Sequence, residues 1–547
     1  MTLRAAALAL AAFMALADAA IAVLALPPML VDLDTTVVGV ASVIAVYTGG
    51  VAATVAVLQR RARSTLPPGI GTWGCALFGI GALVCAVSPS IAPLVAGRLL
   101  QSIGGGAVML VAFDELRGKP AGGRLWTAIA TFGLAAGPAL GGVLTEIFGW
   151  RSIFGAQVPV AVVAAVALAR APSVRLAPAR RLVIEDPGSR RAAGSALVAL
   201  SGALTGVLFL LILLLVAGWA TSPLTAAAAV TVLPLAAIAG GSIPGRPARL
   251  AVAGAALVAA GTAPLAFVPN ASLAWVVGPQ VLAGLGMGMS IGALAGGLLP
   301  ESTTVEAARL LVFRHVGMTL VLAALAPVVA HELQAAVDDA KLQGTALVLD
   351  AAIDPVRKVA LATLLVSTVD DEQPRAALRS SEQVAVRNAA AGERPEVRRL
   401  TRVADDVLVG AVNKAFRLAF LIAAAFALLA AVLLVPRFGG ARVLVGGVLA
   451  TALATGAYAY AHHHWQPDRV ALTDPCGAPA PPAADGLPGK AQRLSLQVID
   501  QAACHLGSSR EELVLALADD RDAERFEERH GVNPRSAGGL LRALFGG

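Results

Sequence analysis

Charged and aromatic residues are scarce in this chain. Asp, Glu, Lys and Arg make up 14% of its 547 residues, Phe, Trp and Tyr make up 4%, and hydrophobic residues make up 57%. Soluble domains carry about 25% charged and about 45–50% apolar residues. The shortage of charge therefore excludes an ordinary soluble protein, and the excess of apolar residues predicts an all-α integral membrane protein.

The sequence also lacks the residue patterns of enzymes. Glycines 104–106 lie inside an apolar run rather than after a strand, so they do not form a phosphate-binding loop. No hydrolase triad or metal cluster stands out, and the adjacent histidines 462–464 do not have the spacing of a metal site. We therefore expect no enzymatic activity, no cofactor and no metal.

Only four cysteines are present. Cys75 and Cys85 lie about 15 Å apart along one predicted helix, which excludes a bond between them. Cys476 and Cys504 lie in a polar tail that we place outside the membrane, where disulfides persist. We therefore predict a disulfide between Cys476 and Cys504.

Apolar runs of spanning length recur along the chain and predict thirteen membrane helices. They cover residues 4–30, 37–58, 69–87, 93–114, 124–147, 153–168, 195–217, 222–243, 248–268, 273–299, 310–330, 412–435 and 441–461. The polar stretches between them suggest an insert at 331–411 and a tail at 462–547. We expect amphipathic helices in the insert, one of them starting at Asp354-Pro355, with a floppy loop as the alternative.

Basic residues gather in the loops on one side of the predicted membrane. That side holds about nineteen Lys and Arg, whereas the short loops of the other side hold only Arg151. The asymmetry predicts a cytoplasmic N-terminus in a bacterial inner membrane, with the insert and the tail outside. The same asymmetry argues that the net charge of +7 does not reflect binding of nucleic acid.

The tail should contain a small helical domain. Ser508 and Ser509, followed by Glu511 and Glu512, form a capping-box signal for a helix that ends near Gly531. We expect a shorter helix after Pro534.

Glycines recur every four residues at positions 133, 137 and 141, which places them on one helix face where membrane helices approach closely. Alone they would indicate only a packing stripe. The whole run is more specific: Gly133-xxx-Gly137-Pro138-xx-Gly141-Gly142, then Trp150-Arg151-xx-Phe154 and Pro159. It resembles helix 5 and the start of helix 6 in the major facilitator superfamily, above all its multidrug proton-antiporter branch.

The resemblance covers residues 5–170 and 195–436 and implies two six-helix halves, here with one additional C-terminal helix. It assigns a conformational hinge to Gly133, Gly137, Pro138, Gly141 and Gly142. The resulting organisation is an N-terminal half at 1–169, a cytoplasmic basic linker at 170–194, helices 7–11 at 195–330, the insert at 331–411, helix 12 at 412–436, helix 13 at 441–461 and the tail at 462–547.

Two charged residues inside predicted spans are candidates for proton coupling. Asp18, nine residues before Pro27, matches the family's helix 1 motif. Arg98 and Gln101 share a face and match the helix 4 motif, whose arginine is implicated in coupling. Counting from the span ends puts Asp18 and Arg98 in the same half of the membrane, so they are expected to pair. The alternative is a structural ion pair that locks helices 1 and 4.

Four further positions carry weaker expectations. Gln157 and Gln280 are lone polar residues in spans, and we expect interhelical hydrogen bonds from them, with cavity lining as the alternative. Arg314, with His315, should open the eleventh span at the inner interface.

Two departures from the family bear on function. The loop at 57–63 keeps its arginines but lacks the acid that helps to latch the inner gate in relatives. Drug-efflux pockets commonly have aromatic walls, and aromatic residues are rare here. We therefore expect a secondary transporter, a proton-coupled exporter of an amphipathic or lipid-like molecule. Its partners would be protons, membrane lipids and an extracytoplasmic protein that binds 331–411 and 462–547. The alternative is a transporter-like scaffold that binds a cell-envelope enzyme or assembly.

Overall fold

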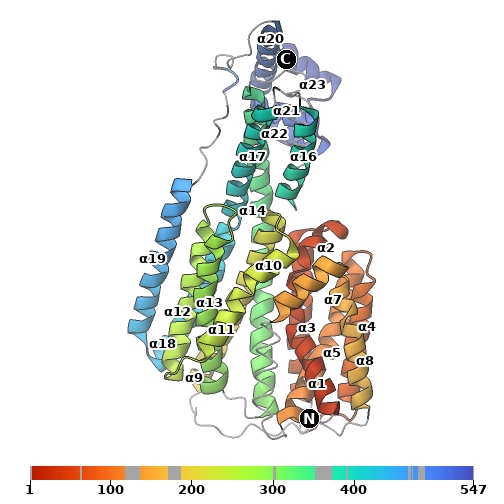
Figure 1. Ribbon diagram of the computed structural model, residues 1–547, viewed down its shortest axis with the longest axis vertical. Coiled ribbons are helices and arrows are strands. Elements are labelled where there is room, and N and C mark those ends of the chain that lie inside the picture. Colours follow the sequence, from red (N-terminus) through yellow and green to blue (C-terminus); the bar gives the residue numbers. More distant parts are fainter. Residues whose placement is uncertain are drawn as a thin grey trace. The chain divides into compact units, whose positions relative to one another are not determined.

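The structure is a computed structural model. It describes residues 3–61, 65–117, 136–169, 187–299, 303–351, 373–389, 392, 394–465, 470, 472, 474–477 and 487–545. These residues form helices and no β-strand, as the composition predicts (Figure 1). Gly133, most of the basic linker and the predicted helix start at Asp354 lie outside the described residues.

The chain divides into two compact units. We call the first the membrane bundle; it comprises Met1–Val216, Thr221–His331 and Phe416–His464. We call the second the polar unit; it comprises Ala217–Ala220, Glu332–Ala415 and Trp465–Gly547.

The first half of the membrane bundle is a set of packed helices. They are α1 (Leu3–Val23), α2 (Leu26–Asp32), α3 (Val37–Arg61), α4 (Ile70–Ala86), α5 (Ile91–Arg117), the helix Ala136–Phe148, α7 (Ser152–Gly155) and α8 (Gln157–Leu168). Helix α5 packs against α3 and α4, and α8 packs against α4 and α1. Glycines make the closest approach possible, since a Cβ at Gly104 would lie 2.4 Å from the carbonyl oxygen of Gly74.

The second half of the bundle follows the same plan. Its elements are α9 (Pro187–Ile212), η1 (Leu213–Gly218), α10 (Pro223–Val230), α11 (Val232–Gly241), α12 (Pro247–Thr262), η2 (Ala263–Phe267), α13 (Ala274–Ala293), η3 (Leu294–Leu298), the first part of α14 (Thr304–Asp350), α18 (Arg417–Phe438) and α19 (Ala441–Trp465). Helices α11 and α12 pack on α13, and α18 packs on α9 and α12. Below, "proximal" means the end of the bundle at which α1, α9 and α14 begin, and "distal" means the opposite end.

Apolar helices of spanning length confirm a multi-pass membrane protein. Among the described residues, ten helices are long and apolar enough to cross a membrane. The segments Ala136–Phe148 and Ser152–Leu168 meet at a bend of 118°, and Ile70–Ala86 is a shorter apolar helix. The count of thirteen crossings stays a prediction.

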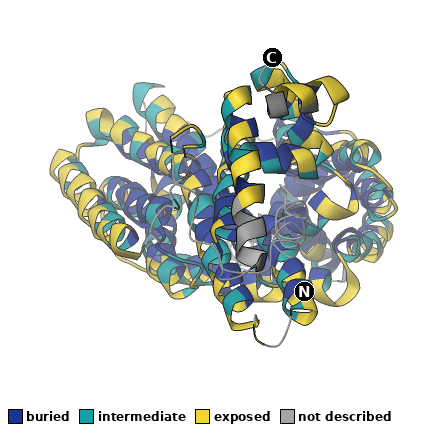
Figure 2. Cartoon of the chain, turned by 90° about the horizontal axis from the view of Figure 1, so that it is seen from above, coloured by how far each residue is buried: buried dark blue, intermediate teal, exposed yellow. Residues whose placement is uncertain are grey.

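Burial separates the helices by position in the bundle (Figure 2). The most apolar window of the α9–η1 segment is 94% buried, whereas that of α19 has none of its residues buried. Helix α9 is therefore a core element, and α19 lies at the periphery with almost all of its surface available to lipid.

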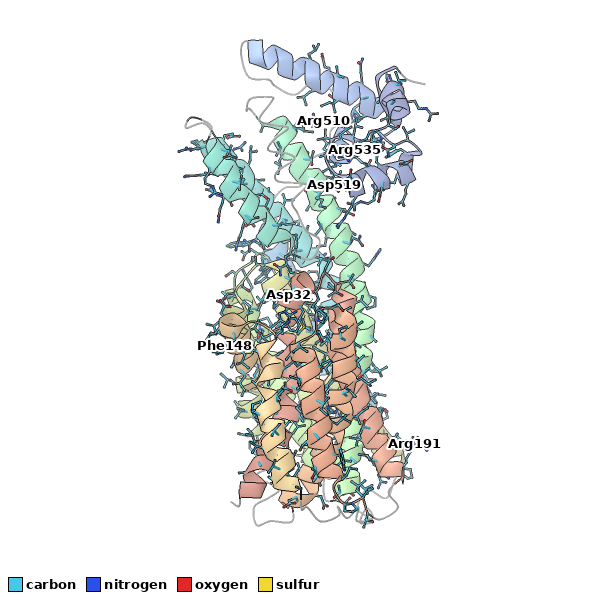
Figure 3. The ribbon with its side chains drawn as sticks, turned by 90° about the vertical axis from the view of Figure 1, so that its right-hand side faces the viewer. Asp32, Phe148, Arg191, Arg510, Asp519 and Arg535 are labelled. Carbon is cyan, nitrogen blue, oxygen red and sulfur yellow. A yellow bond between two sulfur atoms is a disulfide. The ribbon has the colours of Figure 1, made fainter. Side chains whose placement is uncertain are left out.

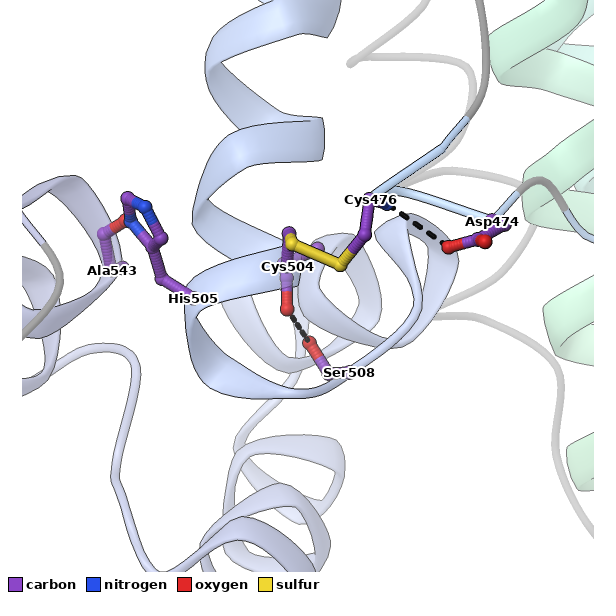
Figure 4. Close-up of a disulfide and its surroundings, with 7 residues drawn as sticks. Asp474, Cys476, Cys504, His505, Ser508 and Ala543 are labelled. Carbon is purple, nitrogen blue, oxygen red and sulfur yellow. Dashed lines mark hydrogen bonds between the residues drawn. A yellow bond between two sulfur atoms is a disulfide. The ribbon is translucent and has the colours of Figure 1, made fainter.

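The polar unit is built from the rest of α14, α16 (Pro374–Asn388), α17 (Arg394–Ala415), α20 (Leu487–Leu506), α21 (Arg510–Ala518), α22 (Asp520–His530) and α23 (Ala537–Phe545). Arg375 of α16 bonds Asp405 of α17 at 2.7 Å. In the tail helices, Phe526 is buried against Ala503 and Leu513. The predicted disulfide between Cys476 and Cys504 is confirmed (Figure 4).

The tail helix predicted to run to Gly531 is in fact two helices. Ser509 caps α21 as expected, by accepting a hydrogen bond from the Glu512 amide at 3.1 Å. The chain then leaves the helix at Asp519, whose carboxylate accepts from the amides of Arg521 and Asp522 and caps α22. The prediction of one helix was wrong because Asp519 is itself a strong N-cap residue.

Candidate functional site

Four buried polar side chains form a closed ring inside the first half of the membrane bundle. Arg98 and Asp18 form an ion pair with 2.6 Å between Nη2 and Oδ2, and both side chains are fully buried. Arg98 Nη1 donates to Gln101 Oε1 at 2.9 Å, Gln101 Nε2 donates to Gln157 Oε1 at 2.8 Å, and Gln157 Nε2 donates to Asp18 Oδ1 at 2.8 Å. We call this the Asp18 ring; it connects α1, α5 and α8.

Aromatic and backbone groups enclose the Asp18 ring. The guanidinium of Arg98 lies 4.2 Å from the ring centroid of Tyr47 and 5.4 Å from that of Phe154, which are cation–π distances. Arg98 Nε donates to the carbonyl of Val43 at 3.0 Å. The Tyr47 hydroxyl donates to the carbonyl of Ala15 at 2.7 Å. The ring therefore holds one buried positive and one buried negative charge.

In this arrangement each of the two buried charges depends on the other. A neutral Asp18 would leave the charge of Arg98 buried without its partner, which is strongly unfavourable in a low-dielectric interior. The geometry permits both of the roles considered for the pair, coupling and locking.

A cavity of about 540 Å³ lies between the two halves of the bundle. Its wall runs from Ala307, near the proximal start of α14, to Leu208, near the distal end of α9. The first half contributes Leu16, Ala19, Ala20, Val23 and Ile44; the second half contributes residues of α9, α11, α13, η3 and α14. A volume of about 300–1,000 Å³ is typical of sites for drug-sized ligands.

Asp18 does not line this cavity. The cavity residues of α1 recur at the spacing of one helix face, and Asp18 lies on the opposite face, toward α5. Gln157 forms interhelical bonds in the Asp18 ring. Gln280 is fully buried on α13 and is not part of the described cavity wall, and its amide atoms have no hydrogen-bond partner among the described residues.

The helix that carries Arg314 begins earlier than the sequence suggested. The expected span began at residue 310, but α14 begins at Thr304, so Arg314 lies ten residues into the helix and in the cavity wall. Thr303 and Glu306 form the capping box, with the Thr303 amide donating to Glu306 at 2.9 Å. His315, the next residue, is buried, and the position of both residues relative to the membrane interface stays a prediction.

The glycines assigned to the hinge lie at helix contacts. A Cβ at Gly141 would come within 2.4 Å of the Ile21 carbonyl oxygen, and one at Gly142 within 2.3 Å of the Ala227 side chain. Gly137 faces Ala20 in the same way. Gly142 thus allows the helix Ala136–Phe148 to touch α10 of the other half, while Pro138, buried one turn earlier, removes a backbone donor from the same helix.

At the distal corner, the Trp150-Arg151 motif binds Asp32, which is labelled in Figure 3. Trp150 Nε1 donates to Asp32 at 2.9 Å, and Arg151 forms an ion pair with the same carboxylate. The hydrogen bonds that Arg151 and Trp150 donate to Asp32 lower the pKa of its carboxyl group.

A proximal contact between the halves was missed by sequence reasoning. The Thr304 hydroxyl donates to Asp114 Oδ1 of α5 at 2.8 Å, and Gln59 of α3 donates to the carbonyl of Val305 at 3.3 Å. Asp114 therefore places an acid at the N-terminus of α14, where a negative charge is favourable. One sequence feature could have pointed to this contact. Asp114 is an acid at the end of an apolar span, and the nearby 57–63 loop contains no acid.

Relatives with assigned names match only part of the chain. "Multidrug resistance protein Stp" of Mycobacterium tuberculosis is 37% identical over 160 residues, which cover 27% of this chain and 29% of that protein. "Methylenomycin A resistance protein" of Streptomyces coelicolor is 33% identical over 95 residues, covering 16% of this chain and 20% of that protein. The matches thus span less than a third of either relative.

Solved structures and a family profile extend the comparison. The crystal structure of a bacterial homolog to the human lysosomal transporter Spinster, in an inward-facing and unoccupied conformation, shares the fold with a TM-score of 0.53 and 15% identity. The match covers 81% of this chain and 97% of that one. Residues 8–321 match the Major Facilitator Superfamily profile, which is more than half of the chain. This membrane protein therefore belongs to the Major Facilitator Superfamily.

Proposed function

We propose that this chain is a proton-coupled exporter of an amphipathic or lipid-like molecule that works by alternating access. The observation that carries the proposal is the double role of α1. One face of α1 lines the cavity with Leu16, Ala20 and Val23, and the opposite face holds Asp18 in its ion pair with Arg98. A change in the charge of Asp18 therefore acts on a helix that contacts the cargo.

In the proposed cycle, Asp18 takes up the coupling proton and its contacts with Arg98 and Gln157 weaken. Helix α1 then shifts against α5 and α8, and the wall that it gives to the cavity shifts with it. The contacts between the halves, Gly142 with Ala227 distally and Asp114 with Thr304 proximally, are where such a movement would open or close the cavity. The drug-resistance names of the relatives support export as the direction.

The proposed topology has thirteen spans, a cytoplasmic N-terminus and a polar unit outside a bacterial inner membrane. The one-sided distribution of Lys and Arg supports it. The Cys476–Cys504 disulfide supports an oxidising location for the polar unit. Protein partners of this unit remain part of the proposal. A transporter-like scaffold would need neither the cavity nor the Asp18 ring, so we favour transport.

Flux measurements in proteoliposomes test the proposal. Purified protein is reconstituted, a pH gradient is imposed, and movement of three fluorescent probes is followed: an alkyl sulfonate, an alkyl trimethylammonium and an alkyl alcohol that share one fluorophore and chain length. The wild type should move at least one probe faster when the gradient is present. Asp18→Asn should lose the gradient-driven part and keep exchange of the probe across equal pH.

Two further variants define the result. Asp18→Glu keeps a carboxylate and should retain part of the gradient-driven flux, and Asp34→Asn removes an exposed acid just beyond α2 and should behave as wild type. Unchanged gradient-driven flux in Asp18→Asn would overturn the coupling role. Absence of protein-dependent flux for all three probes would overturn the transport proposal.

A further inference from the structure

Helices α16 and α17 pack side by side in the polar unit and run in opposite directions (Figure 1). Arg375, at the start of α16, bonds Asp405 of α17 at 2.7 Å. Glu382, two turns further along α16, accepts a hydrogen bond from the hydroxyl of Thr401, one turn earlier on α17, at 3.0 Å. The order of these two contacts fixes the antiparallel direction and identifies the side of each helix that faces its partner.

Five exposed arginines lie on one outer face of this helix pair. Arg379 and Arg387 belong to α16, and Arg394, Arg398 and Arg402 recur every four residues on α17. Around each helix they lie up to about 130° from the side that contacts the partner helix, in the same rotational sense. Because the helices are antiparallel, equal rotation leads to the same face of the pair, and the buried apolar residues of 374–408 lie on the other side of the contact. We call these five residues the arginine face.

The arginine face carries an excess of positive charge. None of its five residues forms an ion pair among the described residues, and Arg394 Nε donates to the backbone carbonyl of Ala389 at 3.3 Å. The two helices contain four acids, of which three are bonded to other side chains: Glu382, Glu396 and Asp405. The fourth, Asp406, lies one turn beyond Arg402 and acts on it electrostatically. Glu393, in the connection between the helices, lies outside the described residues.

The arginine face has no apolar or aromatic component. No large apolar side chain of α16 or α17 is exposed, and neither helix contains Phe, Tyr, Trp or His. Protein partners are usually held by aromatic and apolar anchors at the centre of an interface, and the bases of single-stranded nucleic acids stack on aromatic side chains. Neither kind of contact is available on these two helices. A ligand of this face is therefore recognised through its charge.

The position of the arginines along α17 disfavours the membrane surface as the ligand. Clusters of basic residues that bind anionic lipid typically lie immediately beside a membrane helix. Arg402 instead precedes the end of α17, at Ala415, by thirteen residues, which is about 20 Å of helix. Arg398 and Arg394 lie further still from that end. A soluble polymer therefore fits this face better than a lipid surface does.

We propose that the arginine face docks a linear, soluble polymer that carries phosphate groups. The guanidinium fork matches the oxygens of a phosphate, and the arginines of α17 follow one another at steps of about 6 Å along the axis. A flexible chain of phosphates can therefore contact several arginines at once and release counterions at each contact. In the topology proposed above, such a polymer belongs to the cell envelope. Docking at this face needs no substrate flux, so it is independent of the proposed transport.

Binding of fluorescent inorganic polyphosphate to the full-length protein, held in nanodiscs of neutral lipid, tests the proposal. The wild type should bind the probe saturably, and its affinity should fall about 20- to 100-fold between about 50 and 200 mM salt for three to five phosphate contacts. Arg398→Gln with Arg402→Gln should weaken binding at low salt by about three- to thirtyfold and lower the slope of log affinity against log salt by about 1–2. Arg398→Lys with Arg402→Lys keeps the charge and should keep most of the slope.

A matched control removes the same charge elsewhere in the polar unit. Arg521→Gln with Arg542→Gln changes two exposed arginines of α22 and α23, outside the arginine face, and should bind the probe as the wild type does. All three double variants change only exposed side chains, so each should unfold at about the wild-type temperature. A loss of binding that is confined to the variants of the arginine face is then specific.

Four results would overturn the proposal. The first is a wild type that does not bind polyphosphate. The second is an equal loss of binding in the control and in Arg398→Gln with Arg402→Gln, because only net charge would then matter. The third is binding to anionic lipid vesicles without binding to polyphosphate, and the fourth is tighter binding of polyglutamate of equal charge, which would make carboxylates the preferred groups. None of these results affects the flux assay, which decides the transport proposal separately.

Discussion

Each unit contains a buried arginine whose charge is compensated by acids, and the two units compensate it in different ways. The Asp18 ring sets one acid against one base, and both are completely buried. In the polar unit, Arg510, which is labelled in Figure 3, is also completely buried but has three acids near it. Its Nη2 lies 2.9 Å from Asp350 and 3.0 Å from Glu511, and its Nε lies 3.9 Å from Asp500. We call this the Arg510 cluster.

The difference is one of charge balance and access to water. Asp350 is 41% exposed and Asp500 is 14% exposed, so the extra negative charge of the Arg510 cluster is partly solvated. The charged side chains of the Asp18 ring are not exposed to solvent, so its one acid and one base compensate each other. Two glutamines provide further hydrogen bonds to them. Removal of one charge from the ring would therefore leave the other charge buried without a partner, whereas solvent can compensate part of such a change in the cluster.

Removing one charge from the Asp18 ring is the largest expected effect. Asp18→Asn should lower the free energy of unfolding of the membrane bundle by about 3–5 kcal/mol, because Arg98 remains buried without its counterion. The double variant Asp18→Asn with Arg98→Gln removes both charges and should recover much of the loss. Heat-induced reaction of Cys75 and Cys85 with a thiol-reactive fluorophore reports on this unit, since they are its buried free thiols.

Asp34→Asn serves as the control for that measurement, because it removes an exposed carboxylate and should leave the unfolding curve in place. A double variant as unstable as Asp18→Asn would show that the glutamines and packing, rather than charge balance, hold the ring together. The contrast between the two clusters would then fail.

The polar unit should depend instead on its covalent link. The disulfide joins cysteines 28 residues apart, and removing a link of that loop length costs about 2–4 kcal/mol. Replacing Cys476 and Cys504 together by Ala should speed amide hydrogen exchange in α20, α21 and α22 of the full-length protein. Cys75→Ala, within the bundle, should leave that exchange unchanged. Equal exchange rates with and without the disulfide would show that the polar unit does not depend on this covalent link for its stability.

Sequence reasoning found the ring residues but not their arrangement. Asp18 and Arg98 stand out because a charge within an apolar run is costly, and a lone Gln157 stands out for a similar reason. The closure of the ring depends on how α1, α5 and α8 rotate against one another, which packing determines. For the same reason, no pattern in the sequence showed that Asp18 faces away from the cavity or that Gln280 is outside its wall.

Some errors had a visible signal that was given too little weight. Thr303 and Glu306 form a capping box that begins seven residues before the expected start of the eleventh span, and recognising it would have set the start of the helix at Thr304. Asp519 was another strong N-cap inside a predicted helix. The family resemblance supplied the two-half architecture, whereas the contact of Asp114 with Thr304 joins residues 190 positions apart.

The proximal contact between Asp114 and Thr304 shows a third way in which this chain places an acid, here beside the N-terminus of a helix rather than beside an arginine. Asp114→Ala and Thr304→Ala should each destabilise the bundle, and the double variant should show a coupling free energy of about 0.5–1.5 kcal/mol. Asp114→Asn keeps the acceptor for the Thr304 hydroxyl and should retain part of that coupling. Thermal unfolding read from Cys75 and Cys85 gives the four values of the cycle. Strict additivity would show that the hydrogen bond does not tie the halves together.

The smallest effect is expected from Asp500, where the direction with pH is the informative quantity. Burial raises the pKa of Asp500 above its ordinary value of 3.8; Arg510 opposes the rise, and Glu511 and Asp350 add to it. An acid with a higher pKa in the folded state contributes most to stability below its unfolded value, and this contribution is lost as the pH rises through the folded one. Asp500→Asn should therefore stabilise the polar unit at neutral pH, and the gain should fade as the pH approaches 3.8.

Hydrogen exchange of α20 and α21 at several pH values measures this gain, with Glu528→Gln as a control at an exposed carboxylate of the same unit. A stabilising Asp500→Asn would establish that the Arg510 cluster carries more negative charge than its arginine can compensate. A destabilising one would mean that attraction between Asp500 and Arg510 outweighs burial. The cluster would then resemble the Asp18 ring, whose acid is needed to compensate the buried arginine, and the distinction between a solvated and an enclosed charge cluster would lose its basis.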